Sequence, residues 1–300
     1  MNLNLRKVFV LIALVATVQL CFGQKSKPGI FRADPPFWWI GMSTNKVQLL
    51  VLGKDIANKS VRVDNSELRI DDVHKFSNPN YIAIDLSLNS DFGPGMVEFR
   101  FEENEKIETM AYEFRARRGG SSLRKGVDGS DAIYLAMPDR FSNGNPQNDD
   151  VKGMNQRGVK RDSLFQRHGG DLKGISNHVD YLADLGISAL WLNPVQENNE
   201  PKESYHGYAI TDHYRVDSRL GDNEGYRKLV QQCHDKGIKM IADFVYNHWG
   251  DQHYLNRRMP DNDWVHQQKE FKKTSYRAPT LLDPYASEYD RNTFTDGWFD

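Results

Sequence analysis

Hydrophobic residues alternate with polar ones over residues 24–117, and this pattern is clearest in Val97–Phe101. A period of two indicates β-strands with one buried face. Turn-forming residues such as Asn78–Asn80 and Gly93–Gly95 separate several segments of this kind. Strands are predicted at Val47–Leu52, Val61–Val63, Tyr81–Leu86, Val97–Phe101 and Ala111–Ala116. The pattern predicts an all-β sandwich over residues 24–117.

A different order of elements follows a stretch rich in glycine and serine, residues 118–130, which we interpret as a linker. Ala132–Ala136, Ile187–Leu192 and Ile238–Val245 are apolar runs of strand length. Hydrophobic residues at helical spacing lie between these runs, at 175–185 and around Cys233. This alternation of strands and helices is typical of a parallel α/β fold.

The connections differ in length on the two sides of the predicted sheet. Each helix passes to the next strand through little more than one glycine, Gly186 or Gly237, whereas each strand is followed by a long polar and aromatic loop. In parallel α/β folds the carboxyl ends of the strands carry the functional groups. We therefore expect the functional site to be built from these long loops.

The loop after the first α/β strand is rich in oxygen-bearing side chains. They are Asn143, Asn145, Asn148 and Asp149. Calcium prefers six to eight oxygen ligands, and mixed amides and carboxylates suit it. Asparagine, aspartate and glycine are also common in ordinary turns, so these residues leave a plain polar loop as the alternative.

Aromatic and polar residues follow the second and third strands. Tyr205 and Tyr208 flank a glycine, and tyrosine rings at such a place stack on sugars. Asp243 and Asn247 share one face of the predicted third strand, and His248 follows them. A sugar site and a satisfied polar cluster at a strand end both fit these residues.

The ordered segments resemble the α-amylase family of glycoside hydrolases. Asp243–His248 matches the D-x-V-x-N-H pattern of the family's third strand, and Asp139–Phe141, Gly169–Leu172 and Tyr205–Tyr208 follow its order and spacing. The preceding sandwich resembles the cyclomaltodextrinase and neopullulanase branch. The resemblance implies an N-terminal all-β sandwich followed by the first part of an α/β (β/α)8 TIM barrel, with an excursion after strand three.

The resemblance also implies roles for individual residues. A structural calcium would be bound by Asn143, Asn145, Asn148, Asp149, the carbonyl of Gly169, and Asp171. The family often has aspartate where Asn145 stands, so this site has less negative charge. Tyr208 would stack under the sugar at the cleavage subsite, and His248 would bond a hydroxyl of that sugar. Asp243 would organise the pocket without acting as nucleophile, and His206 lies beside them.

The two carboxylates that perform retaining glycoside hydrolysis are expected elsewhere. The resemblance implies that they follow strands four and five, whereas residues 131–300 contain three predicted strands and no G-x-R-x-D segment. A complete (β/α)8 barrel needs about 250 residues. We therefore expect an incomplete barrel over 131–300 and no catalytic residue in this chain. The nucleophile and the acid/base are expected beyond Asp300, in a longer enzyme of which the chain is the N-terminal half.

The N-terminus has the features of a signal peptide over residues 1–23. Arg6 and Lys7 precede an apolar run, Val8–Leu20, and small residues then stand at positions −3 and −1 before a cleavage point at Gln24. Lipid attachment at Cys21 is the alternative. The run is short for a bilayer span, which needs about 20 apolar residues, so we expect an exported protein, periplasmic or secreted, without a membrane span. Cys233 would then be the remaining cysteine, without an internal disulfide.

The sequence thus predicts an exported hydrolase that cleaves α-1,4-glucosidic bonds, with retention, in maltooligosaccharides, cyclodextrins or pullulan. A non-catalytic glycan-binding protein with the same fold is the alternative. A net charge of −2 argues against nucleic acid or an anionic membrane as partner. Self-association through the N-terminal domain stays open.

Overall fold

The computed structural model describes residues 30–265, 274–275, 284–285, 287–289 and 297–298. The predicted signal peptide and most of the segment after residue 265 lie outside the described residues. Asp300 also lies outside the described residues. The expectation that the catalytic carboxylates lie beyond Asp300 stays a prediction. The chain divides into two compact units, one of residues up to 75 with 79–116, the other of residues 76–78 with those from 117 onward. No helix in the described part combines the length and the hydropathy that a membrane span requires.

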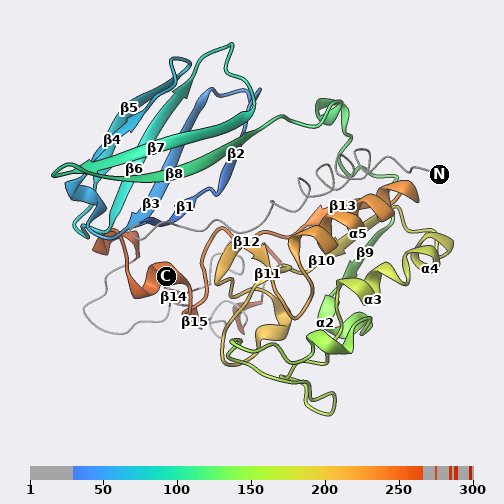
Figure 1. Ribbon diagram of the computed structural model, residues 1–300. Coiled ribbons are helices and arrows are strands. Elements are labelled where there is room, and N and C mark those ends of the chain that lie inside the picture. Colours follow the sequence, from blue (N-terminus) through green and yellow to red (C-terminus); the bar gives the residue numbers. More distant parts are fainter. Residues whose placement is uncertain (1–29, 266–273, 276–283, 286, 290–296, 299–300) are drawn as a thin grey trace, which may run out of the picture. The chain divides into compact units, whose positions relative to one another are not determined.

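The first unit consists of two four-stranded sheets (Figure 1). One has the order β1-β3-β6-β5 and is antiparallel; the other has the order β2-β8-β7-β4, with β2 parallel to β8. The strands are β1 (Ile30–Asp34), β2 (Phe37–Trp39), β3 (Lys46–Gly53), β4 (Ser60–Val63), β5 (Leu68–Lys75), β6 (Tyr81–Leu88), β7 (Gly95–Glu103) and β8 (Lys106–Arg115). A short 3₁₀ turn, η1 (Ile56–Asn58), connects β3 to β4.

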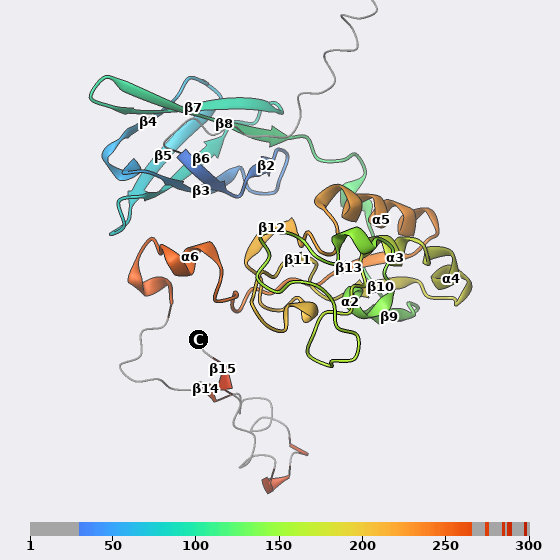
Figure 2. The same ribbon diagram turned by 60° about the horizontal axis from the view of Figure 1, so that its bottom comes forward.

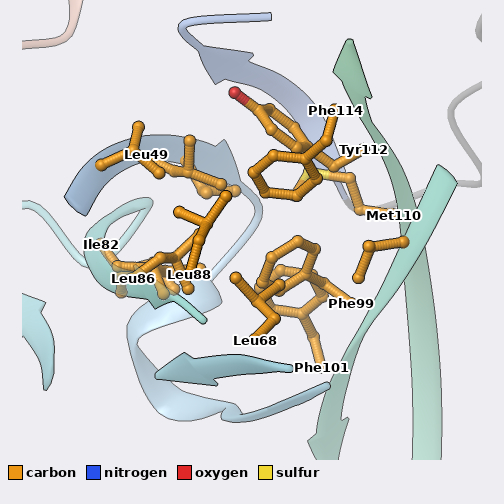
Figure 3. Packing of buried hydrophobic residues seen from close by; sticks show 14 of the residues in the cluster. Leu49, Leu68, Ile82, Leu86, Leu88, Phe99, Phe101, Met110, Tyr112 and Phe114 are labelled. Atoms are coloured by element: carbon orange, nitrogen blue, oxygen red, sulfur yellow. The ribbon is translucent and has the colours of Figure 1, made fainter. Parts of the chain in front are cut away.

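Alternation along the strands places apolar side chains between the two sheets. In β7, Val97, Phe99 and Phe101 are buried, whereas Met96 and Glu98 are exposed. Figure 3 shows Phe99 and Phe101 facing leucines and isoleucines of the other sheet. The prediction of an all-β sandwich is confirmed.

The sequence pattern missed three of the strands, and β5 shows why. Its sequence carries Asp71, Asp72 and His74, which weaken any apolar alternation. β5 lies at an edge of its sheet, where charged outward side chains are common because they discourage pairing with other chains. The strands β1 and β2 were missed because they are too short to show a clear alternation.

The second unit is built on a parallel sheet of β9 (Ile133–Ala136), β10 (Ala189–Leu192) and β13 (Lys239–Ala242), in the order β13-β10-β9. In both views α3, α4 and α5 lie beside this sheet (Figures 1 and 2). The helices are α2 (Pro138–Phe141), α3 (Leu172–Ser176), α4 (Val179–Asp184), α5 (Asn223–Asp235) and α6 (Tyr254–Arg257). Further short elements are the pairs β11 (Gln196–Glu197) with β12 (Asp212–Val216) and β14 (Thr274–Ser275) with β15 (Gly297–Trp298), and the 3₁₀ turns η2 (Ser121–Leu123), η3 (Pro146–Asn148), η4 (Ser204–His206) and η5 (Asn262–Trp264).

Two sequence expectations need correction. The helix expected at 175–185 is broken into α3 and α4, because Nδ1 of His178 lies 2.7 Å from the carbonyl of Gly174, which a continuous helix would offer to the backbone N–H of His178. The third strand ends at Ala242 and not at Val245. The last pair between β13 and its neighbour β10 is Ala242 with Leu192. Pro194 follows two residues later and has no N–H for a sheet ladder, so β10 offers β13 no further pairing.

Helices cover one face of the parallel sheet, whereas the other face has exposed side chains in the described structure. One face packs on the helices through residues such as Leu190 and Leu192, and buried Cys233 of α5 belongs to the same cluster. Burial raises the pKa of the Cys233 thiol to about 11, so it is a neutral core residue. On the other face Leu135 and Trp191 share a row with Ile241, and their exposed fractions in the described structure are 58% and 37%.

A buried carboxylate ties the start of β9 to β13. The Oδ2 atom of Asp131 lies 2.7 Å from Nζ of Lys239, and Oδ1 accepts a hydrogen bond from Ser188 at 2.8 Å. These contacts, the Lys239 bond first, lower the pKa of Asp131 to about 2. Because the folded pKa lies below the ordinary 3.8, the contribution to stability is present above about pH 4 and is lost as the pH falls toward 2.

We expect Asp131→Asn to lower the melting temperature at pH 7, with a difference from the wild type that shrinks between about pH 4 and pH 2. Asp180→Asn is the matched control, since Asp180 pairs with Lys236 at 2.6 Å but is 76% exposed. Thermal melts across this pH range check the prediction. A constant difference down to pH 2, or an equal effect of the control, would contradict it.

Candidate functional site

Three elements converge on Asp243, the residue that follows β13. Its Oδ2 atom accepts hydrogen bonds from the hydroxyl of Tyr208 at 2.9 Å and from the indole N–H of Trp191 at 3.1 Å. Trp191 belongs to β10, and Tyr208 to the loop between β11 and β12. Burial, and then the hydrogen bond to Asp243, raise the pKa of Tyr208, so its hydroxyl stays protonated and donates. The cluster lies at the carboxyl ends of the parallel strands, where the functional site was expected.

The loop that presents Tyr208 has a tightly constrained backbone. It begins after Glu203, which has a φ of 55°, and it contains Gly207 with a φ of 85°. A Cβ atom at Gly207 would lie 2.2 Å from the carbonyl oxygen of Pro194, so glycine is required there. Asn193, directly after β10, donates to the carbonyl of His206 at 3.2 Å and fixes the middle of the loop.

The two predicted histidines contact the same tyrosine. Nδ1 of His206 accepts a hydrogen bond from the backbone N–H of Tyr208 at 2.9 Å, and the two rings stack at 6.0 Å. Burial lowers the pKa of His206, which favours the neutral ring that this acceptor role needs. Nε2 of His248 lies 3.1 Å from the backbone carbonyl of Tyr208. Because a carbonyl only accepts, this nitrogen carries the proton.

The structure therefore brings together all four predicted sugar-binding residues, Tyr208, His248, Asp243 and His206. Their roles toward a sugar stay predictions. Sequence reasoning missed Trp191. The register of the parallel pairing, which the structure supplies, sets Trp191 beside Ile241, two residues before Asp243 on the same face of the sheet.

Most of the residues predicted to bind calcium also lie together, whereas the side-chain oxygen of Asn145 accepts a hydrogen bond from the backbone N–H of Gln147 at 3.3 Å. The amide of Asn143 donates to both carboxylate oxygens of Asp149, at 2.8 and 3.0 Å. A Cβ atom at Gly169 would lie 2.5 Å from Oδ1 of Asp149, so the backbone of Gly169 closes over this carboxylate. The amide of Asn148 donates to Asp171 at 3.3 Å.

Asp171 has a second task within this cluster. Its side chain is fully buried, caps α3 through the N–H of Gly174 at 2.6 Å, and accepts from the backbone N–H groups of Gly144 and Asn145. Loss of Asp171 would therefore disturb the loop and the helix as well as any metal site. Gly144 has no room for a side chain, because a Cβ atom there would lie 2.3 Å from the backbone nitrogen of Gly174.

Two buried acceptors show that these residues fit a cation. The side-chain oxygens of Asn143 and Asn148 are buried, and neither has a hydrogen-bond partner among the described residues. A buried acceptor without a partner costs about 1–3 kcal/mol, and a bound cation would satisfy both. Within the part that the structure describes, no group of three acidic, histidine or cysteine side chains is arranged to bind a metal. A site here would depend on amide and carbonyl oxygens, which suit calcium.

A buried ionic network contacts the predicted calcium ligand Asp149, and sequence reasoning missed it. Arg219 makes a two-pronged pair with Asp217 at 2.9 and 2.6 Å, and both side chains are at most 4% exposed. Arg167, equally buried, donates to the backbone carbonyls of Asp149 and Arg219 and lies 3.7 Å from Asp139. Arg140 pairs with Asp139 as well, so each buried ion of this network has a partner of opposite charge, which is how buried ions are tolerated.

Comparison with known proteins identifies the relatives of both units. Residues 135–295 match the family described as "Alpha amylase, catalytic domain", and residues 32–118 match "Cyclomaltodextrinase, N-terminal". The chain is 45% identical over 120 residues to a cyclomaltodextrinase of Thermoanaerobacter pseudethanolicus, covering 39% of this chain and 20% of the relative.

Two further relatives have similar coverage. A neopullulanase 2 of Thermoactinomyces vulgaris is 38% identical over 125 residues, covering 42% of this chain and 21% of that protein. A periplasmic alpha-amylase of Escherichia coli is 36% identical over 129 residues, covering 39% of this chain and 19% of that protein. The chain thus matches about a fifth of the length of each of these curated relatives.

Proposed function

Because the chain belongs to the α-amylase family of glycoside hydrolases, we propose that it is part of a hydrolase that cleaves α-1,4-glucosidic bonds with retention. The observation that carries this proposal is the convergence of Tyr208 and Trp191 on Asp243 at the carboxyl ends of β10 and β13. The relatives named cyclomaltodextrinase and neopullulanase favour maltooligosaccharides, cyclodextrins or pullulan as substrates.

The cluster offers a ring face and fixed polar atoms to a glucose unit. The Tyr208 ring supplies a surface on which a sugar stacks, and its hydroxyl is oriented by Asp243. The neutral His206 accepts from the backbone N–H of Tyr208, and His248 contacts the backbone carbonyl of the same residue. In this proposal His248 and Asp243 bond sugar hydroxyls, and these bonds strengthen as the ring distorts toward the transition state.

The two carboxylates that break the bond belong, in this proposal, to parts of the enzyme beyond Asp300. In this proposal Asp243 is not the nucleophile, and its Oδ2 atom orients the Tyr208 hydroxyl and the Trp191 indole. Parallel sheets are normally buried on both faces, whereas Leu135 and Trp191 are exposed on one face of this sheet. That face suits the interior of a barrel completed by further strands.

The alternative is a glycan-binding protein that has the sugar contacts but performs no hydrolysis. A hydrolysis assay of the full-length protein separates the two. We expect the full-length protein to cleave maltooligosaccharides, cyclodextrins or pullulan with retained anomeric configuration, and residues 24–300 alone to cleave none. Binding without cleavage by the full-length protein would support the alternative. Turnover by residues 24–300 would overturn the assignment of the carboxylates to other parts of the enzyme.

A structural calcium ion is the second part of the proposal. Its ligands would be the side chains of Asn143, Asn145, Asn148, Asp149 and Asp171 and the carbonyl of Gly169. The ion would join the loop after β9 to the start of α3, and it would supply stability without entering the reaction. The buried, unpartnered oxygens of Asn143 and Asn148 support the proposal.

We expect a chelator to lower the melting temperature of the full-length protein and added calcium to restore it. A ligand at 100 times its dissociation constant stabilises by about 2.7 kcal/mol. Asp149→Ala should abolish the response, whereas Asp150→Ala should retain it, because Asp150 is exposed and pairs with Arg157. Melting curves of the three proteins, with and without calcium, check this. If the melting temperature of the metal-free wild type does not change when calcium is added, the proposed calcium site is contradicted.

We also propose that the protein is exported, on the basis of residues 1–23 and of the periplasmic relative. N-terminal sequencing of the mature protein would test this, with Gln24 as the expected first residue and Met1 as the contradicting one.

A further inference from the structure

A buried side chain of the long segment after β9, Gln156, contacts the loop that presents Tyr208. Arg140 of the same segment lies over the ring of Tyr205, 4.1 Å from its centroid. Oε1 of Gln156 accepts hydrogen bonds from both the backbone N–H and the hydroxyl of Ser204, at 2.8 and 2.6 Å. Gln156 is 5% exposed and Ser204 is 6% exposed. Because both Ser204 donors bond the same buried oxygen of Gln156, the position of Ser204 is closely defined.

Gln156 is itself fixed from two sides. Its backbone carbonyl accepts from Nη1 of Arg219 at 3.0 Å, and Arg219 is anchored by Asp217. Its side-chain amide donates to Oε1 of Gln166 at 3.0 Å. The Gln156 side chain that accepts from Ser204 therefore belongs to a buried residue that is held by the ionic network.

The loop needs such an anchor because it rests on polar groups rather than on a close-packed apolar surface. A cavity of about 10 Å³, roughly the volume that one water molecule needs, is lined by Tyr205 and Gly207. Gln196 and Asn198 also line it, and their side-chain amides include buried atoms without hydrogen-bond partners in the described structure. The left-handed backbone of Glu203, just before Ser204, adds strain at the start of the loop.

We propose that Gln156 is a positioning residue for the sugar site: it fixes Ser204, so that the loop from Ser204 to Tyr208 holds the Tyr208 hydroxyl against Asp243. The segment after β9 thereby gains a role in substrate binding. This role rests on the proposed function, whereas the fixing of the loop does not.

The variants separate positioning from a general structural role. Gln156→Ala removes the acceptor of both Ser204 donors. Gln156→Glu retains that acceptor and loses the donor to Gln166. Gln166→Ala is the matched control. It removes the hydrogen bond that the Gln156 side-chain amide donates to Gln166, and it leaves both Ser204 bonds in place.

Hydrogen exchange of the full-length protein is the first readout. We expect the amides of residues 204–208 to exchange at least about tenfold faster in Gln156→Ala, and close to the wild-type rate in Gln156→Glu and Gln166→Ala. Unchanged exchange in Gln156→Ala would overturn the proposal. Equal acceleration in Gln166→Ala would also overturn it, because the effect would then come from loosening the whole segment.

Kinetics on a maltooligosaccharide are the second readout. A loop that is competent for only a fraction of the time raises KM by the inverse of that fraction, so we expect KM to rise about tenfold in Gln156→Ala, with kcat within about threefold of the wild type. Gln156→Glu should restore KM. An unchanged KM in an active enzyme would overturn the role in substrate binding. If the wild type cleaves no α-glucan, the proposed function fails, and hydrogen exchange alone decides whether Gln156 fixes the loop.

Discussion

Replacing Tyr208 by alanine is expected to lower kcat of the full-length enzyme on maltooligosaccharides by roughly ten- to a thousandfold, on the order of 1.4 to 4 kcal/mol. The substitution removes a ring face for the sugar and the hydroxyl that Asp243 orients. His248→Ala should have an effect of similar size, since it removes a hydrogen bond that strengthens as the sugar distorts. A contact made mainly in the transition state lowers kcat together with kcat/KM.

Two further variants make this prediction specific. Tyr208→Phe retains the ring and loses the bond to Asp243, so it separates stacking from hydrogen bonding. Tyr181→Ala is the control, because Tyr181 is 57% exposed on α4. Steady-state kinetics of the four variants check the expectation. If Tyr208→Ala and His248→Ala both keep the wild-type kcat, these residues serve only to pack the loop.

The second large effect concerns the buried pair of Arg219 and Asp217. Arg219→Met leaves the Asp217 carboxylate buried without its partner, and breaking a buried ion pair from one side costs about 3–5 kcal/mol. The same change also removes donors to the carbonyls of Gln156 and Asn198. We therefore expect a large fall in the free energy of unfolding, measured by urea denaturation.

A matched variant and a double variant complete that experiment. Arg227→Met removes an exposed pair with Glu224, 74% and 52% exposed, and should cost at most about 0.5 kcal/mol. Asp217→Leu combined with Arg219→Met should recover part of the loss, because no charge is then left buried alone. A cost of Arg219→Met as small as that of the control would contradict the assigned role of the network.

The fold was predictable wherever burial imposes a simple period. Alternating residues in β7 revealed the sandwich, and apolar runs gave the three parallel strands in their correct order. The break at His178 was not predictable, because it depends on a side chain that competes with the backbone for the carbonyl of Gly174. Which residues of an unbroken apolar strand face inward is also undetermined by sequence, and Trp191 was missed for that reason.

The site was predictable only in part, for a similar reason. Resemblance to a family pointed to Tyr208 and Asp243, and the structure places them within hydrogen-bonding distance. Nothing in the sequence distinguishes Gln156 or Arg219 from solvated residues of a polar loop. Their burial arises from contacts between segments far apart in the chain, such as Gln156 with Ser204.

The central claim is that Tyr208, Asp243 and His248 form the binding site for a glucose unit of an α-glucan. A crystal structure of the full-length protein with a maltooligosaccharide whose linkages resist hydrolysis tests it most directly. We expect one glucose ring stacked on Tyr208, with hydroxyl groups within hydrogen-bonding distance of Asp243 and His248. An oligosaccharide bound elsewhere, with no sugar in contact with these three side chains, would contradict the account.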